Sequence, residues 1–338
     1  MITNKLVFRF LMMFSLILGI ILIFAPQIID VPQIYTAPNS KTEDVASVEN
    51  KVEEVLNEQD SGDSLSLPSL PRAGLRVPEK ISESKSLGIE TTAKSALVYD
   101  VATGAILFEK NAEEKLSLAS ITKLMTALVF LDTKFEWNKK IKLTREDDEE
   151  GGVFYARAPE EVRLEDLFNM MLVGSTNNAA MAISRSVGFK REDFIQKMNE
   201  KAKALELDSL SFADPSGLDP NNMGTAKDVA KLVFNVLSNE KIREAVRQKR
   251  YVFTLDESKK TYYVKSTDDL LSGFLNESPY TIIGGKTGYT EEAGYNLAVE
   301  LERDGHRIIV VVLGSASTID RFNEVKGLSV WAFENYKW

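Results

Sequence analysis

The chain contains no cysteine and only one histidine. The lack of cysteine excludes thiol catalysis, a lipid-modified cysteine, and zinc or iron–sulfur sites held by thiolates. The single histidine, His306, follows the Asp304-Gly305 turn at the start of a β-rich run, where an exposed turn residue is expected. A hydrolase built from this chain therefore needs a base other than the histidine of the common serine triad. We predict neither a cofactor nor a bound metal.

An excess of positive charge is also absent, because the 338 residues carry a formal net charge of −9. A general nucleic-acid-binding protein needs a basic face to neutralise phosphates, so we expect no nucleic-acid partner. Much of the acidity is local, since residues 41–60 hold seven acidic residues against two lysines. With 44% hydrophobic residues, the chain can bury a sizeable core without metals or disulfides. We predict one large domain with appendages.

Long apolar runs are rare, and the conspicuous one lies at the N-terminus. Residues 10–25 contain no charge and follow Arg9, which is typical of a signal peptide or a signal anchor. This run spans only ~24 Å as a helix, but residues 6–29 could cross a ~30 Å hydrocarbon core if Arg9 snorkels. Pro26 and Pro38 follow the two small-residue sites at which cleavage could occur. We therefore favour an uncleaved anchor over a cleaved signal peptide.

A polar stretch follows the apolar run. Residues 36–93 are rich in Ser, Glu, Asp and Lys and almost lack aromatic residues, so they cannot form a packed core. A flexible tether of this length has a reach of ~40 Å. We predict a cytoplasmic tail and membrane anchor in residues 1–35, a disordered tether in residues 36–93 and a catalytic domain in residues 94–338. The protein would span the cell membrane once, with its catalytic domain on the extracytoplasmic side.

Regular structure is expected from Ala96 onward. Two β-hairpins are predicted, one over residues 96–108 with a turn at Ala102-Thr103-Gly104, and one over residues 296–313 with a turn at Arg303-Asp304-Gly305. Helical periodicity marks the stretches between them and a terminal helix, whose apolar face is formed by Phe322, Val325, Leu328, Trp331 or Ala332, and Tyr336. Strands at both ends with helices between them indicate an α/β fold with one antiparallel sheet.

A candidate nucleophile and base occur together in Ser120-Ile121-Thr122-Lys123. Serine and lysine at positions i and i+3 share a helix face, so the amine can reach the hydroxyl. To act as a base, Lys123 must be neutral, so its pKa must be lowered by ~2 to 3 pH units from the ordinary value of ~10.4. The motif alone is weak, because Ser82-Glu83-Ser84-Lys85 in the tether has the same pattern.

Two further short motifs give the first one its context. Ser175-Thr176-Asn177 follows an apolar helical stretch, and Lys286-Thr287-Gly288 precedes the second hairpin. Taken singly, the former is more often a helix cap and the latter a turn. Lys286 and Thr287 could instead bind a substrate carboxylate, while Gly288 lets a strand edge approach the substrate backbone. The three motifs in this order favour function over these structural interpretations.

The three motifs together are the signature of penicillin-binding proteins and related β-lactamases. Residues 95–338 resemble the low-molecular-mass D-alanyl-D-alanine carboxypeptidases of the serine DD-peptidase family. Further similar segments are Asp100-Val101-Ala102-Thr103-Gly104, Ser216-Gly217-Leu218-Asp219 and Gly284-Gly285-Lys286-Thr287-Gly288-Tyr289-Thr290. The resemblance implies the DD-peptidase/β-lactamase-like fold, in which N- and C-terminal strands form an antiparallel sheet around a helical region.

The resemblance also implies roles for the first two motifs. Ser120 would be the acylated nucleophile and Lys123 the general base, while Ser175 and Asn177 would relay a proton and position the substrate. The implied reaction removes the terminal D-alanine from peptidoglycan stem peptides, with β-lactam antibiotics as inhibitors.

The third motif would bind the substrate, if the resemblance holds. Lys286, Thr287 and Gly288 would contact it, and Arg321 would bind its carboxylate. The backbone N–H groups of Tyr289 and of the nucleophile would form the oxyanion hole, where one donor is typically worth ~10² to 10³ in rate.

Three other functions remain as alternatives. A DD-endopeptidase that cuts peptidoglycan crosslinks would use the same residues. A β-lactamase would need an additional carboxylate, which Glu165 or Asp166 superficially offers, and a non-catalytic receptor would bind wall peptides or β-lactams without turnover. The chain departs from the family at Thr176 and Asn178, where Gly or Ala and then Asp are frequent, so the cleft could accept a different stem peptide. We expect no additional C-terminal domain after Trp338.

Overall fold

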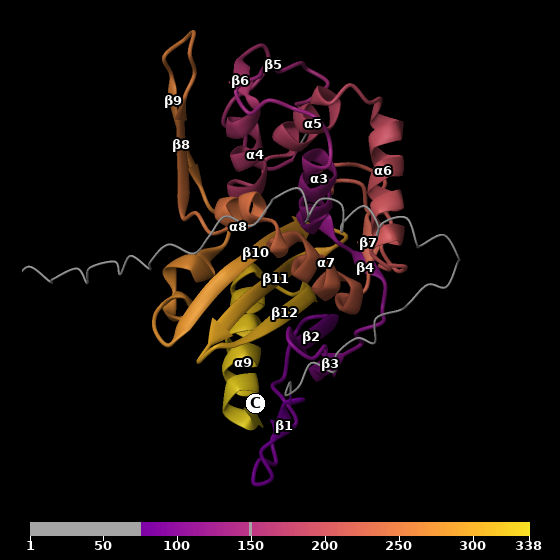
Figure 1. Ribbon diagram of the computed structural model, residues 1–338, viewed down its shortest axis with the longest axis vertical. Helices are drawn as coiled ribbons and strands as arrows, with labels where there is room; N and C mark the ends of the chain where they lie inside the picture. Colours follow the sequence, from indigo (N-terminus) through magenta and orange to yellow (C-terminus); the bar gives the residue numbers. More distant parts are fainter. Residues whose placement is uncertain (1–75, 149–150) are drawn as a thin grey trace, which may run out of the picture. The chain divides into compact units, whose positions relative to one another are not determined.

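The computed structural model describes residues 76–148 and 151–338 (Figure 1). The predicted anchor and most of the predicted tether lie outside the described residues. Among the helices of the described part, none combines the length and the apolar character that crossing a membrane requires.

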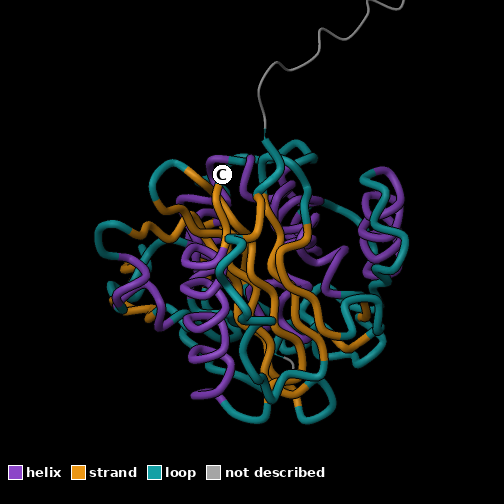
Figure 2. The backbone as a smooth tube through the Cα atoms, turned by 90° about the horizontal axis from the view of Figure 1, so that it is seen from below, coloured by secondary structure: helices purple, strands orange, loops and turns teal. Residues whose placement is uncertain are grey.

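A five-stranded antiparallel sheet forms the centre of the domain, and Figure 2 shows its strands running between helices. The first strands of the domain pair with the last ones, because β2 lies beside β12. This arrangement confirms the predicted fold class. The strand order is β10 (Tyr280–Thr290), β11 (Gly294–Arg303), β12 (His306–Ser315), β2 (Ser95–Asp100) and β3 (Ile106–Lys110).

Local turn chemistry explains both predicted hairpins. Between β11 and β12, Asp304 and Gly305 have φ angles of 53° and 82°, which the two central residues of a tight hairpin turn require. Between β2 and β3, the Asp100 carboxylate accepts hydrogen bonds from the N–H and the hydroxyl of Thr103 at 2.8 and 2.6 Å. Gly104 then continues the turn with a φ of 76°. Both hairpins are confirmed.

Helices cover the sheet on its two faces. Alternate residues of β12 point into separate cores, with Ile309, Val311 and Leu313 on one side and Ile308, Val310 and Val312 on the other. Helix α7 packs on the first face and α9 on the second. The helices are α3 (Thr122–Leu131), α4 (Leu164–Val173), α5 (Asn177–Ser186), α6 (Arg191–Ala204), α7 (Ala226–Ser238), α8 (Glu240–Val246) and α9 (Thr318–Asn335).

Short elements complete the domain. The β8–β9 hairpin stands beside α4 in Figure 1 and packs against it. The short strands are β1 (Glu79–Lys80), β4 (Leu116–Ser117), β5 (Lys140–Lys142), β6 (Glu161–Arg163), β7 (Met223–Gly224), β8 (Arg250–Thr254), β9 (Thr261–Lys265) and β13 (Tyr336–Lys337). Three 3₁₀ turns are η1 (Ala119–Ile121), η2 (Asp269–Ser272) and η3 (Phe274–Asn276).

The described end of the predicted tether belongs to the folded domain, which corrects its predicted boundary. Within residues 76–93, β1 pairs with β13, and the Thr92 N–H donates to the Glu324 carboxylate. Ala93 is fully buried. Composition did not reveal this order because the partners of the segment in backbone pairing, hydrogen bonding and packing lie far along the chain. The predicted face of α9 is confirmed, except that Tyr336 lies in β13 after the helix ends.

Candidate active site

Ser120 lies in η1, directly before α3. The residue before it, Ala119, has a φ of 47°, which is uncommon for a residue with a side chain. Strained backbone of this kind costs about 1 to 3 kcal/mol and clusters at functional sites. The turn places the Ser120 hydroxyl 2.8 Å from the ammonium nitrogen of Lys123, one turn later. The expected proximity of serine and lysine is therefore present.

Lys123 is fully buried and is held from three directions. Besides the Ser120 hydroxyl, its Nζ donates to the side-chain oxygen of Asn177 at 2.7 Å and to the backbone carbonyl of Ser216. All three acceptors are neutral. The lysine is therefore fixed against the nucleophile without a direct hydrogen bond to a carboxylate among these contacts, as a base that must lose its proton requires.

The second motif turns sharply after α4. Ser175 has a φ of 58°, so the chain reverses there and α5 begins at Asn177. The Asn177 amide joins two parts of the site, because its oxygen accepts from Lys123 while its nitrogen donates to the Gly151 carbonyl at 2.9 Å. The Ser175 hydroxyl accepts a hydrogen bond from Lys286 at 2.8 Å. Residues of the second motif thus contact Lys123 of the first motif and Lys286 of the third.

Strand β10 brings the third motif against the nucleophile. A Cβ at Gly288 would lie 2.8 Å from the Leu118 carbonyl oxygen and 3.2 Å from the Ser120 nitrogen, so a side chain there would push the strand away. A Cβ at Gly217 would collide with the Ala119 carbonyl. Two glycines therefore allow strand, loop and 3₁₀ turn to converge on Ser120. Gly288, which was predicted to let a strand edge approach a substrate, makes its closest contact with η1.

Three further groups form the strand side of the cleft. The Thr287 hydroxyl lies 2.6 Å from the Thr267 hydroxyl. Arg321, from α9, donates to the Gly288 carbonyl at 3.0 Å. Tyr289 is 49% exposed and stacks on Tyr295, with 4.3 Å between ring centroids.

Burial perturbs the charged groups of this wall. Burial, and after it the charges of Lys123 and Arg321, lower the pKa of Lys286 well below its ordinary value. Burial also lowers the pKa of Arg321. Asp268 has its pKa raised by burial to about 6, although a backbone hydrogen bond and the charges of both cations oppose the change. Perturbed groups of this kind are typical of catalytic sites.

One cleft brings the predicted site residues together. It is lined by Ser120, Ser175, Asn177, Thr287, Gly288, Tyr289 and Arg321, among others. Lys123 and Lys286 lie beneath its surface, hydrogen-bonded to the two serines. The similar motif at residues 82–85 lies elsewhere, with Ser84 bonded to Asn335. His306 is exposed and stacks on Trp338.

Sequence reasoning missed several contributors to the cleft. The Ser216 carbonyl contacts Lys123, and the loop that presents it is organised by buried Asp214, whose Oδ1 accepts from the N–H and hydroxyl of Ser216. The Ser216-Gly217-Leu218-Asp219 similarity was the available signal for this loop. Thr267 and Asp268 carried no signal, because neither belongs to a recognised motif.

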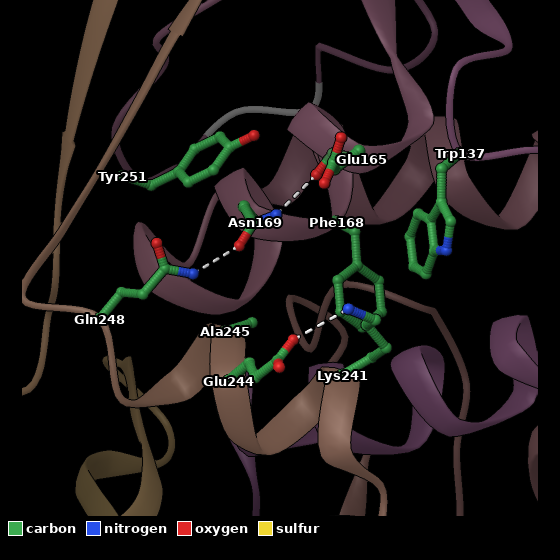
Figure 3. A pocket seen from close by; sticks show the side chains of 9 residues that line it. All are labelled: Trp137, Glu165, Phe168, Asn169, Lys241, Glu244, Ala245, Gln248 and Tyr251. Atoms are coloured by element: carbon green, nitrogen blue, oxygen red, sulfur yellow. Dashed lines mark hydrogen bonds and ion pairs between the residues drawn. The ribbon is translucent and has the colours of Figure 1, made fainter.

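The carboxylates considered for a β-lactamase do not line this cleft. Glu165 lines a different pocket, between α4 and α8, with Trp137 and Tyr251 (Figure 3). Asp166 is buried and bonded to Arg163 at 2.8 Å and to the Tyr251 hydroxyl at 2.6 Å. Neither carboxylate is therefore placed to activate a deacylating water at Ser120.

Comparisons with known proteins agree with this geometry. A family model described as D-alanyl-D-alanine carboxypeptidase matches residues 79–317. A D-alanyl-D-alanine carboxypeptidase of Bacillus subtilis, DacF, is 29% identical over 72% of this chain and 63% of its own length. A D-alanyl-D-alanine endopeptidase of Haemophilus influenzae is 34% identical over 61% of this chain and 69% of its own length. The chain thus spans somewhat less than two thirds of the first of these relatives.

Solved structures give the same result. Penicillin-binding protein D2 from Listeria monocytogenes, in its cefotaxime-bound form, is 31% identical, with a TM-score of 0.64 over 73% of this chain and 99% of that one. A variant of the Streptomyces K15 DD-transpeptidase is 26% identical, with a TM-score of 0.67 and the same coverage. The resemblance predicted from the motifs is confirmed, and the chain belongs to the D-alanyl-D-alanine carboxypeptidase family.

Proposed function

We propose that the domain is a serine-type D-Ala-D-Ala carboxypeptidase that removes the terminal D-alanine from peptidoglycan stem peptides. The observation that carries this proposal is the placement of Lys123, buried and hydrogen-bonded to the Ser120 hydroxyl and to Asn177. A serine activated by an adjacent amine is the arrangement that covalent acyl transfer needs when no histidine is near.

The reaction would proceed in two steps. The Ser120 Oγ attacks the carbonyl carbon of the penultimate D-alanine, and its proton passes to neutral Lys123. The C–N bond to the terminal D-alanine breaks, and the leaving amine takes up a proton, either from Lys123 or through the Lys286–Ser175 pair, whose atoms lie 2.8 Å apart. Water then hydrolyses the ester on Ser120, which releases the shortened peptide and restores the hydroxyl.

The strand side of the cleft would hold the substrate's end. Thr287 offers a hydroxyl, and the cations Lys286 and Arg321 suit the terminal carboxylate. The Ser120 and Tyr289 N–H groups are the proposed oxyanion donors, because the close approach at Gly288 brings η1 and β10 together.

Labelling with a fluorescent penicillin tests the nucleophile, since a β-lactam carbonyl mimics the scissile acyl group. The wild-type protein should carry one adduct on Ser120, located by peptide mass, and Ser120→Ala should carry none. Ser82→Ala, which alters the exposed copy of the same motif, is the matched control and should label like the wild type. Persistent labelling of Ser120→Ala would refute the assignment.

Endopeptidase activity is a second candidate, favoured by the 34% identity to the Haemophilus influenzae endopeptidase. Incubation with a labelled pentapeptide and, separately, with crosslinked muropeptide dimers separates the two activities. Loss of one D-alanine from the pentapeptide identifies a carboxypeptidase, whereas cleavage of dimers alone identifies an endopeptidase.

We also propose that an N-terminal anchor holds the protein in the cell membrane, with its domain on the extracytoplasmic side. The charge-free run after Arg9 supports this proposal. The full-length protein should stay with membranes through high-salt and alkaline washes. Recovery of a soluble native protein beginning near residue 26 or 38 would indicate a cleaved signal peptide instead.

A further inference from the structure

A buried carboxylate directly follows Thr267, whose hydroxyl lies 2.6 Å from the Thr287 hydroxyl on the strand side of the cleft. Asp268 precedes η2 and is only 5% exposed. Its Oδ1 accepts the Leu270 N–H at 2.9 Å, while its Oδ2 is buried and has no hydrogen-bond partner among the described residues. A buried carboxylate oxygen without a donor is costly, so a fold retains it only against a compensating benefit.

The charged groups that act on Asp268 come from three elements. Lys286 from β10 and Arg321 from α9 are both cations of the cleft wall, and Asp269 is its exposed neighbour in η2. The hydrogen bonds of the two cations go to neutral oxygens, those of Ser175 and Thr287 for Lys286, and the Gly288 carbonyl for Arg321. No hydrogen bond joins Asp268 to either cation among the described residues, so its influence on them is through space.

Lys123 and Lys286 are both buried and repel each other as cations, so a charge that acts on one also affects the other. Lys286 is disfavoured as a cation by its burial and by Lys123 and Arg321, and the charge of Asp268 is what opposes them. Two buried amines that repel each other share protons, so stabilising the charge on one makes the other easier to keep neutral. The charges around Lys286 therefore influence how readily Lys123 loses its proton.

We propose that Asp268 is a positioning residue whose carboxylate holds the proton on Lys286, so that Lys123 stays neutral and the cleft presents a cation to the substrate's terminal carboxylate. This inference rests on the proposed function. Asp268 does not line the cleft, and it acts only through Lys286 and Arg321. A direct ion pair would occupy the donors that the substrate needs, whereas a carboxylate at longer range biases the proton and leaves them free.

Asp268→Asn should lower activity by weakening the hold on the Lys286 proton. Asp268→Asn removes the negative charge, so the pKa of Lys286 falls further and the proton is lost from Lys286 at lower pH. Lys123 then gains a proton more readily, and the carboxylate-binding cation weakens. We expect kcat/KM for a pentapeptide to fall about tenfold near pH 7.5, and the alkaline limb of its pH profile to move down by about one pH unit.

The experiment compares pH profiles from 5 to 10 for the full-length protein, with pentapeptide hydrolysis and penicillin acylation as readouts. Asp269→Asn makes the same change one residue away, at an exposed side chain 3.7 Å from Lys265, and should alter kcat/KM less than twofold without moving the limb. Asp268→Glu keeps the charge and should retain the wild-type limb. Asp268→Ser, which can still cap η2, carries the same prediction as Asp268→Asn should the latter fold poorly.

The outcomes separate the inference from the proposed function. An unmoved limb in Asp268→Asn and Asp268→Ser, or an equal shift in Asp269→Asn, would overturn the role of Asp268 while leaving Ser120 acylation intact. A wild-type protein that penicillin does not acylate at Ser120 would instead overturn the proposed function itself.

Discussion

The two ends of α4 lead to two polar regions that treat buried charge differently. Near its start, Asp166 has its own partners, Arg163 and Tyr251, beside the pocket drawn in Figure 3. Beyond its end, Ser175 enters the cleft, where Lys286 is bonded only to neutral oxygens. The structural network pairs its charges directly, whereas no carboxylate is hydrogen-bonded to Lys286 among the described residues.

Backbone strain follows the same division. Ser175 in the cleft and Ala119, which directly precedes Ser120, have positive φ angles, whereas the residues that line the pocket between α4 and α8 have none. Backbone strain and buried charge both cost stability, so their coincidence at one place indicates that the cleft is optimised for binding and chemistry rather than for folding.

The largest effect is expected for Lys123→Arg. Arginine stays protonated in the working pH range, so the cleft keeps a cation but loses its base. Acylation of Ser120 by penicillin should slow by ~10² to 10⁴, with the folded state retained, as stopped-flow labelling and circular dichroism would check. Lys231→Arg, at a surface position of α7, should acylate at the wild-type rate, and a near-normal rate in Lys123→Arg would disprove the lysine mechanism.

The next effect concerns the stability cost of Asp268. Because its folded pKa of about 6 lies above the unfolded value of 3.8, the charged form is disfavoured in the native state. Its contribution therefore destabilises the domain by about 3 kcal/mol above pH 6, and the penalty disappears as the pH falls from about 6 to below 4. Asp268→Asn lacks this group, so the difference in unfolding free energy between variant and wild type should shrink over that window in denaturant titrations. A pH-independent difference would contradict the prediction.

A smaller effect is expected in the network of Asp166, Arg163 and Tyr251. Tyr251→Phe removes the hydrogen bond to the Asp166 carboxylate, which should lower the free energy of unfolding by about 2 kcal/mol. Its kcat/KM should match the wild type, because neither residue reaches the cleft. Tyr263→Phe is the matched control, since that side chain is 61% exposed on the neighbouring strand, and it should leave both quantities unchanged. A catalytic defect in Tyr251→Phe would show that the two regions are coupled.

The smallest effect is predicted for His306→Ala. This side chain is exposed and stacks on Trp338, away from the cleft, so only a few tenths of a kcal/mol of stability should be lost. Acylation should change less than twofold across the pH range. A large loss of activity would instead place a histidine in the mechanism.

Local patterns predicted much of the fold. Both hairpins, the helix periodicities of α4 and α9 and the antiparallel sheet follow from turn residues and apolar spacing, which depend on near neighbours in the chain. The boundary of the tether did not follow, because residues 76–93 are ordered by partners more than 200 positions away, such as Glu324.

The sequence by itself determined the three motifs, their order and the Ser120–Lys123 spacing, since one helical turn sets that distance. The groups that meet these motifs from other parts of the chain depend on tertiary packing. The Ser216 carbonyl reaches Lys123 across 93 positions, and Thr267 contacts Thr287 of the third motif from a separate loop. Contacts of this kind depend on how all the elements pack, and on glycines at 217 and 288 that permit the approach, so no local pattern encodes them.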